Sequence, residues 1–367
     1  MTNRDKIQEE AISELLKHRK GTCAISMGVG KTLIGLKHMA IHFNGTNRFL
    51  VVAPKVSIFQ SWKDDAVKFK MGYLLEFMDF TTYLSLHKRK SENYNVIYLD
   101  ECHSLLFSHK KFLNKYEGKI VGLTGTPPVN SYSEKFEMVN TYCPVIYTYK
   151  VDQAVKDNIL NEYSIKVHLL SLSQNKDLKV NTKQGSSFFT SEKDKYEYCN
   201  QTIAYSEIGS SSYQFAVISR MTALKQFNTK ERYVKGMLAH IKDKCIVFAN
   251  TQAQADRICK HSVHSKNRYS AKNLQSFKDG DINHLSCVDQ LNEGVTIPDL
   301  KVGIIMHAYG NERKTNQRIG RLLRLNPNQL ASIHILCYKG TVDEKWTTEA
   351  LSGIDPTKIE YIDKTLT

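Results

Sequence analysis

The residues best suited to chemistry begin with a glycine-containing loop that ends in lysine and threonine, Ser26-Met27-Gly28-Val29-Gly30-Lys31-Thr32. An apolar run precedes it and a helical pattern follows it, which is the context of a phosphate-binding loop. Glycines let the backbone approach phosphate oxygens, and the start of the following helix favours anions. We therefore expect Lys31 to reach the β- and γ-phosphates of a nucleotide and Thr32 to bind Mg²⁺. The alternative is a strand-to-helix turn without a ligand, since Ile25 stands where the strict pattern has glycine.

An adjacent pair of carboxylates is the second chemical signal. Asp100-Glu101-Cys102-His103 directly follows the apolar run Val96–Leu99. The carboxyl end of a buried strand is where α/β sheets place their ligands. Asp100 could hold Mg²⁺, and Glu101 could orient and deprotonate an attacking water. A helix N-cap formed by Asp100 is the alternative, and the phosphate loop earlier in the chain favours the nucleotide site.

Short apolar runs that alternate with helical stretches predict the elements that position these residues. Continuous apolar runs of this length are typical of buried parallel strands, and their alternation with helices predicts an α/β fold. The expected strands are Thr22–Ser26, Phe49–Ala53, Val96–Leu99, Ile120–Leu123, Lys166–Leu172, Cys245–Phe248, His284–Val288, Val302–His307 and Ile333–Leu336.

The same pattern predicts two domains. We expect the first over residues 1–150, the second over 151–347 and a C-terminal tail over 348–367. The stretch from Cys143 to Glu162 is predicted to connect them. The polar stretch Asn175–Lys195 is predicted to be a loop that leads into helices.

The composition is that of a folded protein, and its basic charge favours a polyanionic partner. The 367 residues include 51 Lys and Arg against 37 Asp and Glu, a formal net charge of +14. This excess favours nucleic acid as the partner over an anionic membrane surface. No apolar run approaches the length of a membrane-spanning helix, about 18 residues, and no secretory signal is evident. Eight cysteines without a C-x-x-C pair argue against a zinc ribbon or a disulfide scaffold and indicate a reducing, intracellular compartment.

The motifs of the first half, taken in order, resemble those of superfamily 2 helicases and translocases. Gln8 resembles the glutamine that recognises adenine, and residues 100–103 resemble a DExH box. Val51-Val52-Ala53-Pro54-Lys55 and Phe80-Thr81-Thr82-Tyr83 resemble segments that grip the nucleic-acid backbone, which implies contacts from Pro54, Lys55 and Thr81. Leu123-Thr124-Gly125-Thr126-Pro127-Pro128 resembles the segment in which Thr124 and Thr126 would couple hydrolysis to strand movement.

The resemblance continues through the second half. Ile246-Val247-Phe248-Ala249-Asn250 resembles the strand that opens the second motor domain, which implies a nucleic-acid contact at Asn250. Glu293 and Gly294 lie in a segment that resembles the link between nucleic acid and nucleotide. Residues 317–324 match Q-x-x-G-R-x-x-R at every defined position.

The resemblance implies two tandem RecA-like α/β domains with parallel sheets, and ATP and Mg²⁺ in a cleft between them. Glu101 would activate the attacking water, which Gln317 would help to position. Arg321 and Arg324 would stabilise charge on the γ-phosphate, a role that suits planar guanidinium groups. Closure and opening of the cleft would alternate the grip of each domain, so that the motor steps along one strand.

The implied function is that of an ATP-dependent DNA helicase or translocase in DNA remodelling, replication, recombination or repair. We expect DNA rather than RNA as the partner, bound through its backbone without sequence specificity. The alternatives are an RNA helicase, a double-stranded-DNA translocase that remodels without unwinding, and a non-enzymatic nucleic-acid-binding protein with a vestigial nucleotide site. We further expect a monomer, with accessory proteins as further partners and no membrane contact, in the cytoplasm of a bacterial or phage-infected cell.

Overall fold

The structure, a computed structural model, contains two compact units, residues up to Asn161 and residues from Glu162 onward, here called unit 1 and unit 2. The sequence expectation placed this division after residue 150. The residues described are 2–26, 28–181, 185–288, 297–308, 315, 318, 319 and 330–364.

The end of unit 1 is tied to its first helix, α1 (Asn3–Lys17). Asn3 and Arg4 donate hydrogen bonds to the backbone oxygens of Asp157 and Ile159. These contacts keep the turn after α6 (Val151–Lys156) within unit 1.

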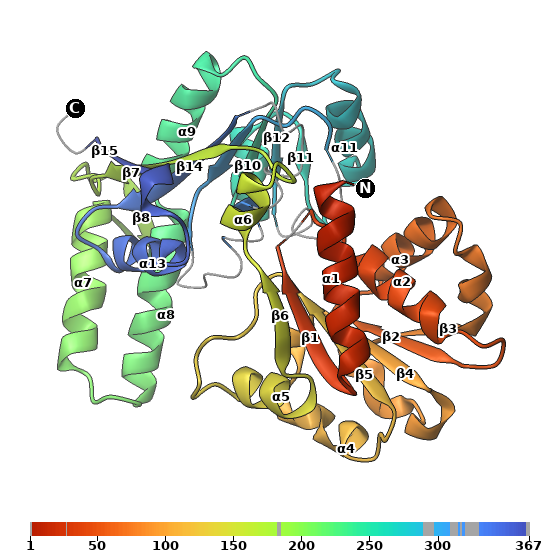
Figure 1. Cartoon of the computed structure of the whole chain (residues 1–367). Helices are drawn as coiled ribbons and strands as arrows, with labels where there is room; N and C mark the ends of the chain where they lie inside the picture. Colours follow the sequence, from red (N-terminus) through yellow and green to blue (C-terminus); the bar gives the residue numbers. More distant parts are fainter. Residues whose placement is uncertain are drawn as a thin grey trace. The chain divides into compact units, whose positions relative to one another are not determined.

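Unit 1 is built on a six-stranded parallel sheet in the order β3-β2-β4-β5-β1-β6 (Figure 1). Its central strands are buried along their whole length, as continuous apolar runs predict. All carboxyl ends of a parallel sheet meet at one edge, so the segments that follow β1, β2, β4 and β5 are brought together. The strands are β1 (Lys20–Ile25), β2 (Phe49–Ala53), β3 (Met78–Thr82), β4 (Val96–Asp100), β5 (Lys119–Thr124) and β6 (Val145–Tyr149).

The helices of unit 1 cover this sheet and begin at recognisable signals. The Thr2 side chain and Asp5 form a reciprocal capping box at the start of α1, which packs on β1 and α2 (Figure 1). The remaining helices are α2 (Lys31–His42), α3 (Ser57–Lys68), α4 (Lys110–Leu113), α5 (Glu134–Tyr142) and α6.

Unit 2 contains a seven-stranded parallel sheet in the order β11-β12-β10-β13-β14-β7-β15. Its core lies between the sheet and the helices and is formed mainly by aliphatic side chains with Phe227 and Tyr338. The strands are β7 (Tyr163–Leu170), β10 (Cys245–Phe248), β11 (Ser262–Val263), β12 (His284–Cys287), β13 (Val302–Ile305), β14 (Ala331–Tyr338) and β15 (Ile359–Asp363).

An antiparallel β-hairpin and a pair of packed helices follow β7. The hairpin is β8 (Leu178–Asn181) with β9 (Ser187–Thr190), and the helices are α7 (Glu192–Tyr205) and α8 (Ser211–Gln226) (Figure 1). The other helices of unit 2 are α9 (Asn228–His240), α10 (Gln252–Ile258), α11 (Ser270–Asp279) and α13 (Val342–Leu351).

All nine strands expected from the sequence are confirmed, with ends that differ by a few residues. Two segments differ from their predictions, one expected to connect the domains and one expected to be a loop. The stretch from Cys143 to Glu162 contains β6 and α6, and the stretch Asn175–Lys195 contains the β8–β9 hairpin and the start of α7. β6 is an apolar run at the edge of the sheet that the prediction passed over, whereas β8 and β9 are short, largely exposed strands without a continuous apolar run.

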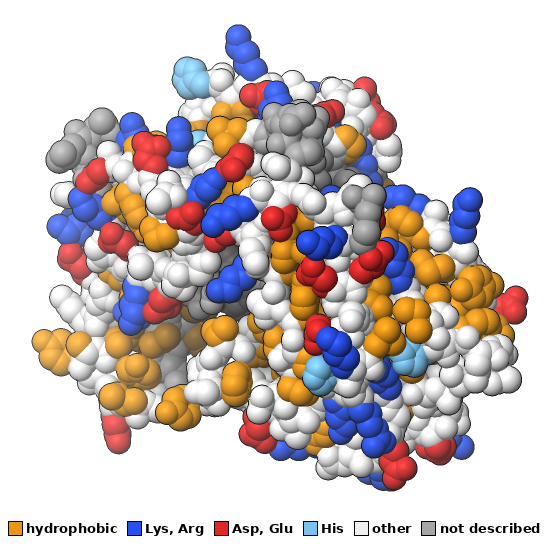
Figure 2. Space-filling view, viewed as in Figure 1, with side chains coloured by type: hydrophobic (Ala, Val, Ile, Leu, Met, Phe, Trp, Pro, Cys, Tyr) orange, Lys and Arg blue, Asp and Glu red, His pale blue; other side chains and the backbone are white. Residues whose placement is uncertain are grey.

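The α7–α8 pair presents apolar side chains to solvent, seen as orange atoms at the lower left of Figure 2. The most exposed are Tyr205 (91%) and Ile208 (85%), at the turn between the two helices. No helix in the described part of the chain is long and apolar enough to cross a membrane.

Two histidines on neighbouring strands make unit 2 sensitive to acid. His168 Nε2 lies 2.8 Å from His334 Nδ1, and Tyr233 of α9 lies 2.9 Å from His168 Nδ1. Burial lowers the pKa of both histidines to about 4, and nearby positive charges, Lys166 among them, act in the same direction. Because the unfolded chain binds these protons more readily, stability is complete above the ordinary pKa of 6.5 and is lost as the pH falls towards 4.

We therefore expect that the free energy of unfolding, measured with urea at pH 7 and pH 5, decreases at the lower pH. The decrease should be smaller for His334→Gln, which removes one of the two groups. His240→Gln is the control, since His240 is exposed on the same unit. An equal decrease in all three proteins would contradict this assignment.

Candidate nucleotide and nucleic-acid site

The phosphate loop joins β1 to α2 at the carboxyl edge of the unit 1 sheet. Gly28 and Gly30 have φ angles of 94° and 103°, a region that side chains other than glycine rarely occupy. Gly30 caps α2, and Lys31 and Thr32 form the first residues of that helix. The loop therefore points the start of a helix, with its backbone N–H groups, at the space in front of it.

Gln8 of α1 supports this loop from behind. Its Nε2 donates to the Val29 carbonyl oxygen at 2.8 Å, and its Oε1 accepts from Lys37 Nζ at 2.9 Å. The φ angle favours glycine at position 30, and a Cβ added there would lie 2.8 Å from Gln8 Nε2, so the Gln8 amide would have to shift. Gln8 is 1% exposed, and both ends of its amide hold the phosphate loop against α2.

Asp100 is the last residue of β4, and its carboxylate accepts a hydrogen bond from a tryptophan indole. Trp62 Nε1 of α3 donates to Asp100 Oδ2 at 2.9 Å, and Tyr83 Oη donates to the Asp100 carbonyl oxygen at 2.9 Å. Burial and the neighbouring Glu101 charge raise the pKa of Asp100 to about 6. The carboxylate bonds to Trp62 rather than capping a helix. Trp62 thus fixes the orientation of an acidic side chain.

Glu101 lies at the centre of a polar cluster. Its Oε1 is 3.8 Å from Lys31 Nζ, and its Oε2 is 3.4 Å from both His103 Nδ1 and Thr124 Oγ1. Glu101 has a left-handed backbone with φ of 51°, which is uncommon for a residue with a side chain and often marks a functional site. The turn directs the Glu101 carboxylate toward the phosphate loop.

Thr124 connects this cluster to the end of β5. Its Oγ1 lies 2.8 Å from His103 Nδ1 and accepts a hydrogen bond from the Thr126 backbone N–H at 3.1 Å. The structure therefore brings Lys31, Glu101 and Thr124 together, three residues that lie far apart in the sequence. His103, which sequence reasoning assigned no role, bridges two of them.

The site has the features that a triphosphate with Mg²⁺ requires. Ser26 Oγ and Thr126 Oγ1 are buried and have no hydrogen-bond partner among the residues whose positions are described. Buried hydroxyl groups without a partner are costly, so a ligand with acceptor oxygens would satisfy them. A lysine and two carboxylates beside a helix start complete a donor set suited to phosphate and a hard cation.

The candidate nucleic-acid residues of unit 1 lie at the same edge of the sheet. Pro54 and Lys55 follow β2, and the Lys55 side chain is exposed. Thr81 lies on β3, and its side chain is only 4% exposed. Lys55 is therefore accessible to a polyanion in this structure, whereas the Thr81 side chain is part of the interior.

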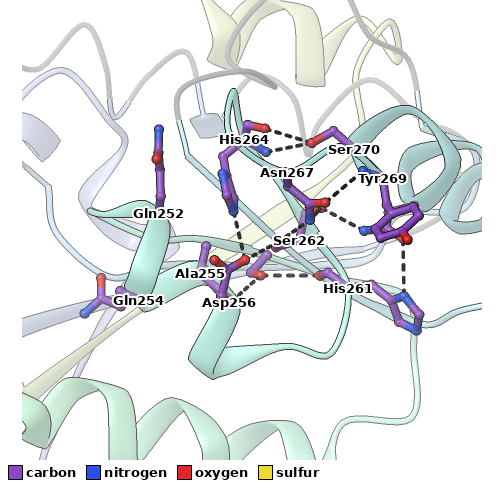
Figure 3. Close-up of polar contacts among 12 residues, drawn as sticks. Gln252, Gln254, Ala255, Asp256, His261, Ser262, His264, Asn267, Tyr269 and Ser270 are labelled. Atoms are coloured by element: carbon purple, nitrogen blue, oxygen red, sulfur yellow. Dashed lines mark hydrogen bonds and ion pairs between the residues drawn. The ribbon is translucent and has the colours of Figure 1, made fainter.

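In unit 2, Asn250 follows β10, and its backbone N–H donates to Gln254 Oε1 at 3.0 Å. A polar network orders the neighbouring loop after β11 (Figure 3). Asp256 Oδ1 lies 2.8 Å from His264 Nε2 and accepts from Ser262 Oγ at 2.5 Å. Gln252 Nε2 donates to Ser265 Oγ at 3.0 Å, which connects the start of α10 to the loop after β11.

The ordered loop carries exposed cations that sequence reasoning did not single out. Lys266 and Arg268 are exposed between β11 and α11, and the Arg268 guanidinium lies 4.7 Å from the centre of the Tyr269 ring. Ser270 Oγ donates to the His264 carbonyl oxygen at 2.8 Å and so closes the loop (Figure 3).

Several predicted site residues lie outside the described residues. These are Met27, Glu293, Gly294, Gln317, Arg321 and Arg324. Their roles remain predictions from the sequence.

Two family models match the chain. The model described as "Type III restriction enzyme, res subunit" matches residues 2–129, and the "Helicase conserved C-terminal domain" matches residues 228–326. The first range holds the phosphate loop and Glu101, and the second holds Asn250 and residues 317–324. The DNA 3'-5' translocase XPB2 of Sulfurisphaera tokodaii is 25% identical in an alignment of 367 positions that covers 92% of this chain and 82% of that protein.

Solved structures share the fold. The ATP-dependent Type ISP restriction-modification enzyme LlaBIII bound to DNA has a TM-score of 0.63 and 14% identity over 97% of this chain, which spans 31% of that enzyme. A putative HsdR subunit fragment from Vibrio vulnificus YJ016 has a TM-score of 0.63 and 18% identity, covering 98% of this chain and 68% of that one. S. cerevisiae Dbp5 bound to RNA and ADP BeF3 has a TM-score of 0.59 and 14% identity, and the match covers 98% of this chain and 89% of that one.

These likenesses identify the two α/β units as tandem RecA-like domains. Together with the two family models and the translocase relative, they place this chain in the superfamily 2 helicases and translocases, which are nucleic-acid-dependent ATPases.

Proposed function

We propose that this protein is a motor that uses ATP hydrolysis to move along DNA. The observation that carries the proposal is the convergence of Lys31, Glu101 and Thr124 beside a glycine loop at one sheet edge. A helicase relative named as a DNA translocase, with 82% of its length covered, favours DNA over RNA. An RNA helicase is the second candidate, because Dbp5, which shares the fold, is bound to RNA.

In this proposal the residues of unit 1 bind the triphosphate and prepare the attacking water. The backbone of the phosphate loop and Lys31 hold the β- and γ-phosphates, while Gln8 braces the loop from behind. Glu101, whose Oε1 lies 3.8 Å from Lys31 Nζ, takes a proton from water. Asp100 and Thr32 would hold Mg²⁺, which would neutralise negative charge on the phosphates.

The remaining roles follow from the sequence. Gln317 would help to position the water, and Arg321 and Arg324 of unit 2 would stabilise the transition state. Glu293 and Gly294 would link bound nucleic acid to the nucleotide. We take unit 1, predicted from the sequence as residues 1–150, and unit 2, predicted as residues 151–347, as the two motor domains.

Nucleic acid would bind through its backbone at the carboxyl edges of the two sheets, through Pro54, Lys55 and Asn250, whereas the side chain of Thr81, predicted as a further contact, is interior. The exposed loop after β11 adds Lys266 and Arg268 to this surface in unit 2. Such contacts carry no sequence information, so binding should depend on salt rather than on base sequence.

Removing Lys266 and Arg268 together should therefore weaken DNA binding and make it less dependent on salt. In fluorescence anisotropy titrations, the slope of log affinity against log salt should become shallower by about 1 for each lost cation. Lys242→Ala, an exposed lysine just before the start of β10, should leave the slope unchanged. A double variant with the wild-type slope would exclude this loop from the DNA contact.

An ATPase panel tests the proposed function. The rate should rise with single-stranded, duplex, forked or four-way DNA and rise less with matching RNA. A larger rise with RNA would favour the RNA helicase, and no rise with any polymer would overturn the motor proposal. Stimulation by duplex DNA without strand separation on forks would assign translocation without unwinding.

We also propose a monomer in a reducing, cytoplasmic compartment of a bacterial or phage-infected cell, with accessory proteins as further partners. The eight cysteines support this proposal, since all are buried free thiols.

A further inference from the structure

Unit 2 contains a fully buried lysine whose three donors are all used. Lys230 is the third residue of α9 and is 1% exposed. Its Nζ donates to the backbone oxygens of Met306 and Leu336, each at 2.8 Å, and to Asp343 Oδ2 at 2.5 Å. An ammonium group has three donors, so this one is fully satisfied. It ties α9 to the end of β13, to β14 and to α13.

Asp343 extends this network to a histidine. Its Oδ1 lies 2.6 Å from His307 Nδ1, and its Oδ2 also accepts from the Tyr338 backbone N–H at 3.0 Å. Burial lowers the pKa of His307, while the facing Asp343 carboxylate acts in the opposite direction. Burial works against the ionised carboxylate, but Lys230 and His307 together lower the Asp343 pKa.

The backbone after β13 in turn contacts Thr315 and Arg318, two described residues in the region of the arginine motif. Arg318 Nη1 donates to the His307 carbonyl oxygen at 3.3 Å, and Thr315 Oγ1 donates to the Ala308 carbonyl oxygen at 2.7 Å. Arg318 is 1% exposed, and its guanidinium lies 5.3 Å from the centre of the Phe248 ring at the end of β10. The backbone oxygens of residues 307 and 308 therefore hold the side chains of Arg318 and Thr315 by hydrogen bonds.

A buried ionic network of this kind is a weak source of stability. Taking the charges out of water offsets much of their attraction, and apolar residues of similar volume are often as stabilising or more so. The network instead fixes the geometry of this region, because each hydrogen bond holds one atom in place at the carboxyl ends of β13 and β14. Ligand-facing segments of α/β sheets begin at these ends.

We propose that Lys230, Asp343 and His307 are positioning residues for ATP hydrolysis, which act by fixing the backbone after β13 to which Arg318 is hydrogen-bonded. The inference rests on the proposed function, because Arg321 and Arg324 belong to the same motif. It assigns a functional role to three residues that touch neither nucleotide nor nucleic acid.

The test is a double variant, Lys230→Met with Asp343→Leu, which replaces the ion pair without leaving a buried charge unpaired. Far-UV circular dichroism and the melting temperature should stay close to wild type. The KM for ATP should change by no more than about two-fold, whereas kcat of the DNA-stimulated ATPase should fall by about 10- to 100-fold, as expected when reacting groups are displaced by a fraction of an ångström to an ångström.

A second pair of variants keeps the test decisive if the double variant does not fold. His307→Asn retains an N–H donor for Asp343 and should keep most of kcat. His307→Leu removes that donor and should show the loss, again without a matching change in KM. A residue that served stability alone would not separate kcat from KM in this way.

The matched control is Lys301→Met with Asp243→Leu. This pair is exposed, its Nζ–Oδ1 distance is 3.0 Å, and Lys301 directly precedes β13, at the opposite end of the strand from His307. It should leave kcat unchanged. Wild-type kcat in the folded double variant and in His307→Leu would overturn the positioning role alone. Absence of DNA stimulation in the wild-type protein would overturn the proposed function instead.

Discussion

Replacing Glu101 with glutamine is expected to lower kcat of the DNA-stimulated ATPase by about 10²–10⁴-fold. The amide has nearly the shape of the carboxylate but cannot accept the proton of the attacking water. ATP binding should persist, because the phosphate loop and Lys31 are unchanged. The amide that replaces the carboxylate is neutral, so no charge is left without a partner beside Thr124. Steady-state kinetics and binding of a fluorescent ATP analogue measure the two effects separately.

Glu76→Gln is the control for this variant. Glu76 is exposed in unit 1, in the 3₁₀ turn Gly72–Phe77, and its replacement should leave kcat at the wild-type value. Wild-type turnover in Glu101→Gln would show that another group accepts the proton.

Replacing Arg321 with alanine is expected to produce the largest loss, about 10³–10⁵-fold in kcat, as for other arginine fingers. The guanidinium contacts charge that develops on the γ-phosphate only as the transition state forms, so KM for ATP should change much less than kcat. The prediction follows from the match of residues 317–324 to Q-x-x-G-R-x-x-R.

Arg321→Lys distinguishes geometry from charge. An ammonium keeps the positive charge but loses the planar fork, so most of the loss should persist. Arg232→Ala, which replaces an exposed arginine of α9, should behave as wild type. If Arg321→Ala hydrolysed ATP at the wild-type rate, unit 2 would contribute no finger through this residue.

Much of the fold could be predicted because its central strands are continuous apolar runs. Phe49–Ala53 is buried throughout, and its observed bounds equal the predicted ones. Edge strands gave a weaker signal. β6 exposes Val145, and β15, within the predicted tail, exposes Tyr361, so neither shows the pattern of a buried strand.

The chemistry of unit 1 was predictable in its residue types but not in its supporting contacts. Lys31 and Glu101 follow strands at the same sheet edge, which the sequence implies. The hydrogen bonds from Trp62 to Asp100 and from Gln8 to Val29 depend on how helices pack on the sheet. The Lys230–Asp343 pair joins residues 113 positions apart, and nothing in their local sequence signals it.

The central claim is that this protein couples ATP hydrolysis to movement along DNA. The most direct measurement is the steady-state ATPase rate on linear DNA of increasing length, at saturating and equal nucleotide concentration. A protein that moves spends a larger share of its time travelling on longer DNA, so kcat should rise with length to a plateau. A rate that is the same on the shortest and longest DNA, or that DNA does not raise at all, would contradict the claim.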